Sequence, residues 1–185
     1  MKILVACEYS GTVRDAFLKR GHDAVSCDLL PCDRGPSQHI QGDCIPVITL
    51  GWDLIIMHPP CTALAVSGNR WYGKGMPKHE DREEAIRWTM ALWELAKQHS
   101  PKVAMENPVG VLPVKPTQYI QPWQFGHGET KKTGLWLHNL PPLEPTSIVE
   151  GREQRLWKLP PSADRWKIRS ETFKGIAEAM AEQWG

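Results

Sequence analysis

The sequence has few cysteines and places none of them in a metal-binding or dithiol motif. The cysteines are odd in number, and no two are spaced as a Cys-x-x-Cys pair. This absence excludes the common zinc and thioredoxin-like motifs. It favours a reduced, cytoplasmic protein without a metal site, in which the thiols stay free. The five are Cys7, Cys27, Cys32, Cys44 and Cys61.

Long apolar runs, repeats and low-complexity tracts are also missing. No stretch approaches the roughly 18 consecutive apolar residues of a transmembrane helix, and Met1-Lys2 leads directly into a strand-like segment instead of a signal peptide. The 185 residues contain no linker-like segment, and a typical domain has about 100 to 200 residues. We therefore expect one domain that covers residues 1–185 and is neither exported nor inserted in a membrane.

The net charge is small, but the basic residues are unevenly distributed. The formal net charge is +1 at pH 7. Residues 62–79 contain three basic residues and no acidic one, and residues 111–170 contain nine basic and five acidic residues, so the rest of the chain is net acidic. Basic residues collected on one face are typical of proteins that bind phosphate groups. Ordinary solvated loops would give the same counts, so both interpretations stay open.

Strand and helix patterns alternate in the first half of the chain. Residues 3–7, 23–27 and 53–57 are short apolar runs with the length of buried parallel strands. Between the first two, residues 12–20 have helical spacing and stop at Gly21. This order of strand, helix and further strands predicts an α/β protein.

The second half begins with the same patterns and then becomes rich in proline. Residues 80–99 predict a long amphipathic helix, and residues 102–105 predict a short strand. The following stretch, about residues 108–169, contains nine prolines and predicts a small irregular lobe with at most short strands. A last helix is expected to begin near Ser170 or Thr172.

Polar or reactive residues follow the predicted strands. The loop Glu8-Tyr9-Ser10-Gly11 follows the first strand, Asp28 the second, Pro59-Pro60-Cys61 the third and Glu106-Asn107 the fourth. Because ligands of a parallel α/β sheet bind beyond the carboxyl ends of its strands, we expect these residues to share one edge. Each segment alone is a weak signal, whereas their order and spacing together predict a catalytic site.

This series resembles the DNA cytosine-5 methyltransferase family, in which Gly42-Asp43 would follow the second segment and Glu106-Asn107-Pro108 lies 45 residues after Cys61. The chain looks like its compact phage and prophage members. The resemblance implies a Rossmann-like methyltransferase fold with a mostly parallel sheet and helices on both faces. It also implies that the protein transfers a methyl group from S-adenosylmethionine to carbon 5 of cytosine in DNA. Related enzymes that methylate exocyclic amines have an aromatic residue in place of Cys61, so the thiol favours carbon 5.

The resemblance assigns the cofactor to the ends of the first three strands. Asp28 would hydrogen-bond the ribose hydroxyls, Leu29 would pack on the adenine, and Asp43 would accept from the adenine amino group. The first loop departs from the family because it has one glycine and a charged Glu8. Glu8 therefore either contacts the cofactor or caps the following helix. The other residues implied at the cofactor are Cys7, Tyr9, Ser10, Gly11, Cys44, Pro59, Ser170 and Thr172.

Cys61 and Glu106 carry the chemistry that the resemblance implies. A Cys61 thiolate that adds to carbon 6 of cytosine makes carbon 5 nucleophilic toward the sulfonium methyl group. Glu106 would share a proton with ring nitrogen 3, as a carboxyl group of raised pKa. Pro60 belongs to the nucleophile motif, and Asn107 would fix the local geometry. His58 is either a base for the thiol or a strand-end residue that points elsewhere.

Basic and aromatic residues follow the proposed nucleophile. In this segment Arg70 and Lys74 would grip the DNA backbone, while Trp71 or Tyr72 stacks as the target base is flipped out. The alternative is a surface loop whose aromatic side chains cover the core.

Two parts of the family pattern are missing. The Gln-x-Arg-x-Arg element is absent, and its nearest substitutes are Lys131 and Lys132, with Arg165 and Arg169 as rivals. Fewer than 40 residues separate Lys132 from Ser170, where the family places a large target-recognition domain. We therefore expect little sequence specificity. Two alternatives stay open: modification of a free deoxycytidine nucleotide or a non-methyl modification of cytosine, and a catalytically silent cofactor or nucleic-acid binder.

Overall fold

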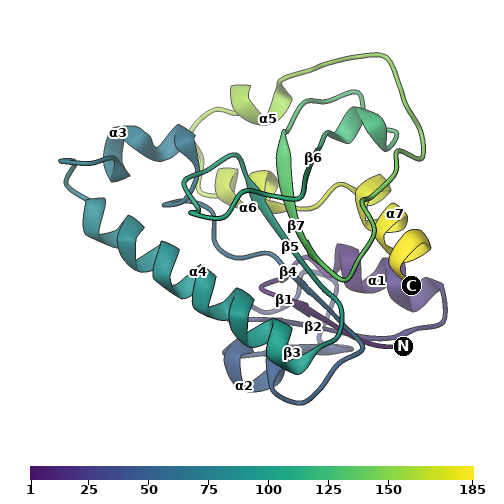
Figure 1. Cartoon of the computed structure of the whole chain (residues 1–185). Helices are drawn as coiled ribbons and strands as arrows, with labels where there is room; N and C mark the ends of the chain where they lie inside the picture. The colour runs from purple at the N-terminus through teal and green to yellow at the C-terminus, as the bar shows by residue number, and fades with distance from the viewer.

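The computed structural model describes all 185 residues and contains one seven-stranded sheet (Figure 1). The strand order across the sheet is β3-β2-β1-β4-β5-β7-β6. The first five strands in this order are parallel, whereas β7 runs antiparallel to both of its neighbours. The strands are β1 (Lys2–Ala6), β2 (Asp23–Asp28), β3 (His39–Gln41), β4 (Leu54–Met57), β5 (Val103–Pro108), β6 (Gln118–Ile120) and β7 (Thr133–His138).

Helices cover both faces of the sheet, with α1 and α7 on one face and α2 and α4 on the other (Figure 1). The helices are α1 (Thr12–Lys19), α2 (Cys44–Ile48), α3 (Asn69–Tyr72), α4 (His79–His99), α5 (Arg155–Lys158), α6 (Arg165–Ser170) and α7 (Lys174–Trp184), with short 3-10 turns η1 (Val66–Gly68) and η2 (Pro122–Gln124). The predicted α/β class is confirmed, and the mostly parallel sheet is compatible with a Rossmann-like fold.

The side chains of the central strands alternate between two cores. On β1, Ile3 and Val5 belong to the core on the side of α1 and α7, whereas Leu4 and Ala6 belong to the core on the side of α2 and α4. Successive side chains of a strand point to opposite faces, so a strand with helices on both sides is apolar at every position. This is why the strand sequences are continuous apolar runs.

The proline-rich stretch contains short strands, as the sequence predicts, and they extend the main sheet. Strands β6 and β7 lie within this stretch and join the sheet, and Ile120, Leu135 and Leu143 enter the core on the α7 side. The six residues of β7 contain no proline, so their N–H groups are free to complete a ladder with β5. Residues 62–79, for which a surface loop was one of the two expectations, contain the short helical segments η1 and α3.

Two helices begin at other residues than the sequence predicts. The last helix begins at Lys174, later than predicted, because Ser170 instead ends the separate helix α6. Helix α4 starts one residue before its predicted range, and its first turn carries Glu80 and Asp81, which favour the positive end of the helix dipole. None of the helices combines the length and the hydropathy that crossing a bilayer requires.

Candidate active site

The strand register brings the predicted segments to one edge of the sheet. Ala6 pairs with both Cys27 and Met57, and Met57 pairs with Met105. The residues that follow Cys27, Ala6, Met57 and Met105 therefore lie side by side at the carboxyl ends of the four neighbouring strands β2, β1, β4 and β5. These residues are Asp28, Cys7, His58 and Glu106.

Glu106 lies against His58 at this edge. The Nδ1 atom of His58 is 3.3 Å from Oε2 of Glu106, and the two side chains are only 10% and 14% exposed. Burial raises the pKa of Glu106, but the hydrogen bond with His58 and the charge of Lys131 outweigh burial and hold this pKa below its ordinary value. The prediction of a raised pKa at Glu106 is therefore wrong for the free protein, in which this carboxyl group is ionised at neutral pH.

Cys61 lies just beyond β4, at the start of a turn. Its carbonyl oxygen accepts a hydrogen bond from the Ala65 N–H at 2.9 Å, which fixes the backbone beside the thiol. Burial and the negative charge of Glu106 raise the pKa of Cys61, whereas the charges of Lys131 and Arg169 oppose this shift. The thiol is therefore protonated in the free protein and must be activated before it can act as a nucleophile.

Asn107 holds the ends of β4 and β5 together. It is 1% exposed, and its Nδ2 atom donates to the carbonyl oxygen of Pro59 at 2.9 Å. Because Pro59 lies two residues before Cys61, this hydrogen bond fixes the backbone that leads to the thiol. Pro59 itself is buried, and Pro60 is exposed. These contacts agree with the predicted geometric role of Asn107.

Glu8 caps the first helix. It is 5% exposed, its Oε1 accepts from the Val13 N–H at 2.6 Å, and its Oε2 accepts from the Arg14 N–H at 3.3 Å. These N–H groups belong to the first turn of α1, which has no helical partner for them. Ser10 also donates to Glu8, at 3.3 Å, and Gly11 has a φ of 70°, which favours glycine. These hydrogen bonds show that Glu8 caps α1, which is one of the two roles left open for it.

The C-terminal segment returns to the loop after β1. The hydroxyl oxygens of Tyr9 and Ser170 are 2.8 Å apart, and the Tyr9 hydroxyl donates to the Lys167 carbonyl at 3.1 Å. The ring of Tyr9 also lies 5.7 Å from that of Trp166. Ser170 therefore lies beside the first loop, whereas half-buried Thr172 is not part of this hydrogen-bonded group.

Asp28 and Asp43 are oriented by backbone hydrogen bonds. Oδ1 of Asp28 accepts from the Leu30 N–H at 2.9 Å, and Oδ1 of Asp43 accepts from the Ile45 N–H at 3.0 Å as the cap of α2. Leu29, next to Asp28, is 74% exposed. An uncovered apolar side chain beside an oriented carboxylate suits a ligand with one apolar and one hydroxyl-bearing part.

Cys7 and Cys44 form a thiol pair beside these residues. Their sulfur atoms are 3.7 Å apart, and all five cysteines of the chain are free. Cys7 has a φ of 58°, which turns the chain sharply after β1. No group of three or more His, Cys, Asp or Glu side chains is arranged to hold a metal ion.

The two lysines predicted as a pair have different surroundings. The charge of Lys131 acts on both Cys61 and Glu106. Lys132 instead places its Nζ atom 4.4 Å from the centre of the Tyr119 ring. Of the two lysines, Lys131 is therefore the one whose charge acts at the proposed site.

The other basic residues predicted to bind DNA also have different surroundings. The charge of Arg169 acts on Cys61, whereas Arg165 donates to the Trp157 carbonyl at 3.4 Å. The guanidinium group of Arg70 lies 5.6 Å from the centre of the Trp71 ring, and Lys74 is exposed. Of this set, Arg169 is the residue that the structure connects with the thiol.

Arg82 is a buried residue near the site whose role the sequence did not predict. It is 5% exposed and donates to the carbonyl oxygens of Ala63 at 2.6 Å and Ala65 at 3.1 Å, and to Oδ1 of Asn69 at 2.7 Å. Arg82 therefore ties the segment after Cys61 to α4. The available signal was a charged residue four positions before Ile86, on the apolar stripe of the predicted helix.

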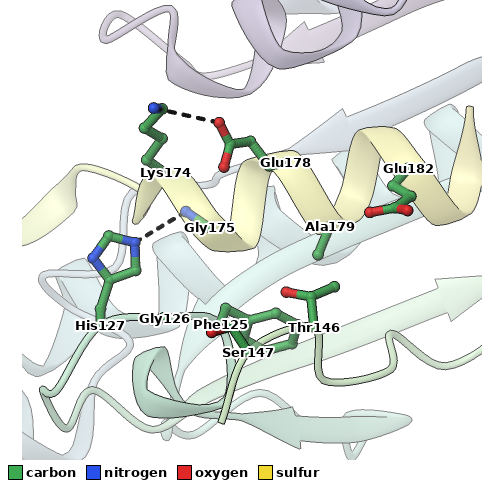
Figure 2. A pocket seen from close by; sticks show the side chains of 10 residues that line it. All are labelled: Phe125, Gly126, His127, Thr146, Ser147, Lys174, Gly175, Glu178, Ala179 and Glu182. Atoms are coloured by element: carbon green, nitrogen blue, oxygen red, sulfur yellow. Dashed lines mark hydrogen bonds and ion pairs between the residues drawn. The ribbon is translucent and has the colours of Figure 1, made fainter. Parts of the chain in front are cut away.

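A cavity of about 450 Å³ lies away from this edge, between α7 and residues 125–127 and 146–147 (Figure 2). Figure 2 shows His127, whose Nε2 accepts from the Gly175 N–H at 3.0 Å, and the ion pair of Lys174 with Glu178. None of the predicted site residues lines this cavity. A smaller hollow of about 280 Å³ lies between Pro60 and the first half of α4, and neither Cys61 nor Glu106 lines it.

Comparison with known proteins leaves function to be inferred from the site. No protein-family model matches the chain. No match was found among curated protein sequences either.

Proposed function

We propose that the protein is an S-adenosylmethionine-dependent methyltransferase of the cytosine-5 family, acting on carbon 5 of cytosine in DNA. The observation that carries the proposal is the grouping of Cys61, Glu106 and Lys131 at the carboxyl edge of the sheet, where Glu106 raises the pKa of the Cys61 thiol and Lys131 lowers the pKa of both. A thiol, a carboxyl group and a cation are what covalent addition to a cytosine ring requires. The order of the first five strands is that of doubly wound nucleotide-binding sheets, which supports a Rossmann-like methyltransferase fold.

Residues at the ends of β1 and β2 suit S-adenosylmethionine. Ligands of such sheets bind where the strand order reverses, which here is between β1 and β4. Asp28 would hold the ribose hydroxyls, exposed Leu29 would cover the adenine, and Asp43 would accept from its amino group. The cofactor supplies an electrophilic methyl group when it is bound.

Cys61 acts as the nucleophile in the proposed reaction. Its sulfur bonds to carbon 6 of cytosine, and the electron pair of the ring double bond moves toward nitrogen 3. The Glu106 carboxylate takes up the proton that leaves the Cys61 thiol and delivers it to nitrogen 3, so that carbon 5 becomes an enamine carbon. After carbon 5 gains the methyl group, it loses its proton to solvent, nitrogen 3 returns its proton by way of Glu106, the sulfur–carbon bond breaks, and the Cys61 thiol is restored.

DNA is the proposed substrate because exposed basic and aromatic side chains lie on the segment after Cys61 and on α6. Trp71 and Trp166 are 53% and 51% exposed, and Arg70, Lys74 and Arg169 are exposed as well. Exposed aromatic rings next to cations suit stacking on bases and contact with phosphates. We assign the reaction to the cytoplasm, where free thiols persist.

Replacement of the nucleophile tests the proposal. We expect Cys61→Ala to abolish methyl transfer while cofactor binding persists, because the cofactor residues belong to other segments. Labelled S-adenosylmethionine is supplied with DNA and, separately, with dCMP, and we expect label in DNA with the wild type alone. DNA that contains 5-fluorocytosine should trap the wild type covalently, because fluorine at carbon 5 cannot leave as a proton.

Cys32→Ala is the matched control, since Cys32 is another half-buried free thiol. It should keep full activity and the covalent trap. An adduct on a cysteine other than Cys61 would refute the mechanism. Label in dCMP but not in DNA would move the substrate to the nucleotide pool. Cofactor binding without label in either substrate would indicate a silent binder.

A further inference from the structure

Cys7 and Cys44 are the two thiols of the chain that form a hydrogen bond with each other. Their sulfur atoms are 3.7 Å apart, although the two residues are 37 positions apart in the sequence. Two other thiols have different partners, since Cys27 donates to a backbone carbonyl oxygen at 3.5 Å and Cys32 accepts from the Arg14 guanidinium group at 3.3 Å. All five cysteines are free, so the pair is reduced. No chemical step of the proposed reaction uses either thiol.

The backbone of Cys7 has a conformation that few residues other than glycine adopt. Its φ is 58°, in the left-handed region, where a side chain costs stability. Backbone strain of this kind is concentrated at functional sites. The sequence places a thiol at a position that glycine would occupy without strain, and this thiol contacts a second one. The strained turn therefore indicates a role for the Cys7 side chain.

The contact makes Cys44 the more reactive thiol of the pair. The hydrogen bond with Cys7 lowers the pKa of Cys44, whereas the same bond and burial raise the pKa of Cys7. The charges of Asp28 and Asp43 oppose ionisation of Cys44. Cys7 is half-buried and Cys44 is 5% exposed, which admits an oxidant as small as hydrogen peroxide. Because the thiolate is the nucleophilic form of cysteine, Cys44 is the thiol that attacks first.

We propose that Cys7 and Cys44 form a reversible disulfide in response to a hydroperoxide, and that this disulfide closes the proposed cofactor site. The formation of the bond is independent of the proposed function, whereas its effect on the cofactor rests on that function. A disulfide bond is about 2.05 Å long, so the two sulfur atoms need to approach by about 1.7 Å. Disulfides of cytosolic proteins are usually transient and redox-sensing, which suits a pair of this kind.

The oxidation is balanced by the reduction of hydrogen peroxide to water. The Cys44 thiolate attacks one peroxide oxygen, the O–O bond breaks, and hydroxide leaves, so that Cys44 becomes a sulfenic acid. The Cys7 sulfur then bonds to the Cys44 sulfur, and the sulfenic oxygen leaves as water with the proton of Cys7. The hydroxide takes up the proton that Cys44 lost on ionisation. In total, two thiols lose two electrons and two protons, and one hydrogen peroxide gives two molecules of water.

The disulfide joins two segments that belong to the proposed cofactor site. Cys7 precedes Glu8, whose side chain caps α1, and Cys44 follows Asp43, whose side chain caps α2. Drawing the sulfur atoms together shifts both caps, because each cysteine is the chain neighbour of one of them. Asp43 is assigned to the adenine amino group, so its displacement removes a hydrogen bond from the bound cofactor. The loss of one hydrogen bond to a charged group lowers affinity by about tenfold or more.

Treatment of the purified protein with hydrogen peroxide tests whether the bond forms. Trypsin cleavage places Cys7 in the peptide of residues 3–14 and Cys44 in the peptide of residues 35–70. We expect mass spectrometry without reductant to find these two peptides linked, and dithiothreitol to separate them. The second peptide also contains Cys61, so the link should persist in Cys61→Ala and disappear in Cys44→Ala. Cys7→Ala should form no link and should keep a sulfenic acid on Cys44, which dimedone labels.

The affinity for S-adenosylmethionine, measured by calorimetry before and after oxidation, tests the effect on the site. We expect the wild type to lose affinity by about tenfold or more on oxidation and to recover it with dithiothreitol. Cys44→Ala should have the same affinity before and after treatment, because it lacks the attacking thiol. Cys32→Ala is the matched control, since Cys32 is a half-buried thiol outside the pair, and it should respond as the wild type does.

The outcomes separate this inference from the proposed function. An oxidised wild type without the linked peptides, or with Cys7 linked to a cysteine other than Cys44, would overturn the inference. Linked peptides with an unchanged affinity would overturn the closing of the site. A reduced wild type that does not bind S-adenosylmethionine refutes the proposed function, and the linked peptides, which are detected without the cofactor, then decide whether the disulfide forms.

Discussion

At the scale of single residues, two buried glutamates of the same site differ because their partners differ. Burial raises the pKa of Glu8, and the charge of His58 and the N–H groups of Val13 and Arg14 only partly oppose it. Burial acts in the same direction on Glu106, but there the hydrogen bond with His58 and the charge of Lys131 prevail, and the pKa is lowered. Glu8 is therefore suited to hold a helix, and Glu106 is suited to pair with a proton donor.

The raised pKa of Glu8 has a consequence for stability. A carboxyl group whose pKa is higher in the folded state than in the unfolded state contributes stability at low pH, and this contribution is lost as pH rises through the raised pKa. Gln at position 8 keeps an oxygen for the Val13 N–H and removes the buried charge. We expect the free energy of unfolding of Glu8→Gln, relative to wild type, to increase between about pH 4 and pH 8. Urea unfolding at both pH values measures it, with Asp23→Asn on the exposed start of β2 as control. A relative stability that falls over this range would contradict the prediction.

At the scale of elements, α4 positions the nucleophile segment as well as covering the sheet. Leu92, Trp93 and Ala96 in its second half are buried against the sheet. Near its start, Arg82 instead donates to the backbone after Cys61 and to Asn69 at the start of α3. One helix thus joins the core to the loop that carries the thiol, so a change at Arg82 should alter both stability and catalysis.

Arg82→Met keeps the length of the side chain and removes its three hydrogen bonds. A hydrogen bond to a charged group contributes about 1.5–3 kcal/mol, and the contributions of one guanidinium group are not additive. We expect a loss of about 2–4 kcal/mol in unfolding free energy and a decrease of about tenfold or more in methyl transfer, by analogy with misplaced reacting groups. Denaturant titration and single-turnover rates measure these effects.

The control for Arg82 is Arg87→Met, on the exposed side of the same helix. It should leave both quantities close to the wild-type values. Affinity for S-adenosylmethionine should be unchanged in both variants, because the proposed cofactor residues lie on other segments. Normal transfer by a destabilised Arg82→Met protein would show that Arg82 contributes to folding alone.

At the scale of the whole molecule, the exposed tryptophans lie on the short helices α3, α5 and α6, together with several basic residues. Trp157, Trp71 and Trp166 are at least half exposed, whereas Trp93 and Trp184 are buried in the two cores. The segment between β7 and α7 contains only the short helices α5 and α6. Such a segment offers phosphate contacts but few side chains that a major groove could accept, and phosphate contacts carry no sequence information.

DNA binding should therefore depend strongly on salt and weakly on sequence. The affinity for B-DNA falls with a logarithmic slope of about −0.9 for each phosphate that is neutralised. We expect the double variant Arg70→Gln, Lys74→Gln to reduce this slope by about two, and the exposed pair Lys19→Gln, Arg20→Gln to leave it unchanged. Fluorescence anisotropy at several salt concentrations measures the slope.

Bisulfite sequencing of a methylated random DNA library tests the second half of this prediction. We expect a preferred context of at most about two to four base pairs, given how few side chains are available to read bases. A defined site of about six base pairs would show that the segment between β7 and α7 reads base edges directly.

The sequence by itself determined the class of the fold and the residues that end the central strands. The predicted strand at residues 3–7 corresponds to β1, and the predicted helix at residues 80–99 corresponds to α4. These elements were predictable because their apolar periodicity is local and continues over many residues. Strands β3 and β6 have three residues each and helix α2 has five, so their patterns are too short to distinguish from loops.

Only the tertiary structure decided which of the strand-end residues meet and in what state. The contact of His58 with Glu106 joins residues 48 positions apart and follows from the register of β4 against β5. The separation of Lys131 from Lys132 and the lowered pKa of Glu106 likewise depend on neighbours that are distant in the sequence. Register and side-chain packing are set by non-local burial, and a local pattern of residue types carries no information about them.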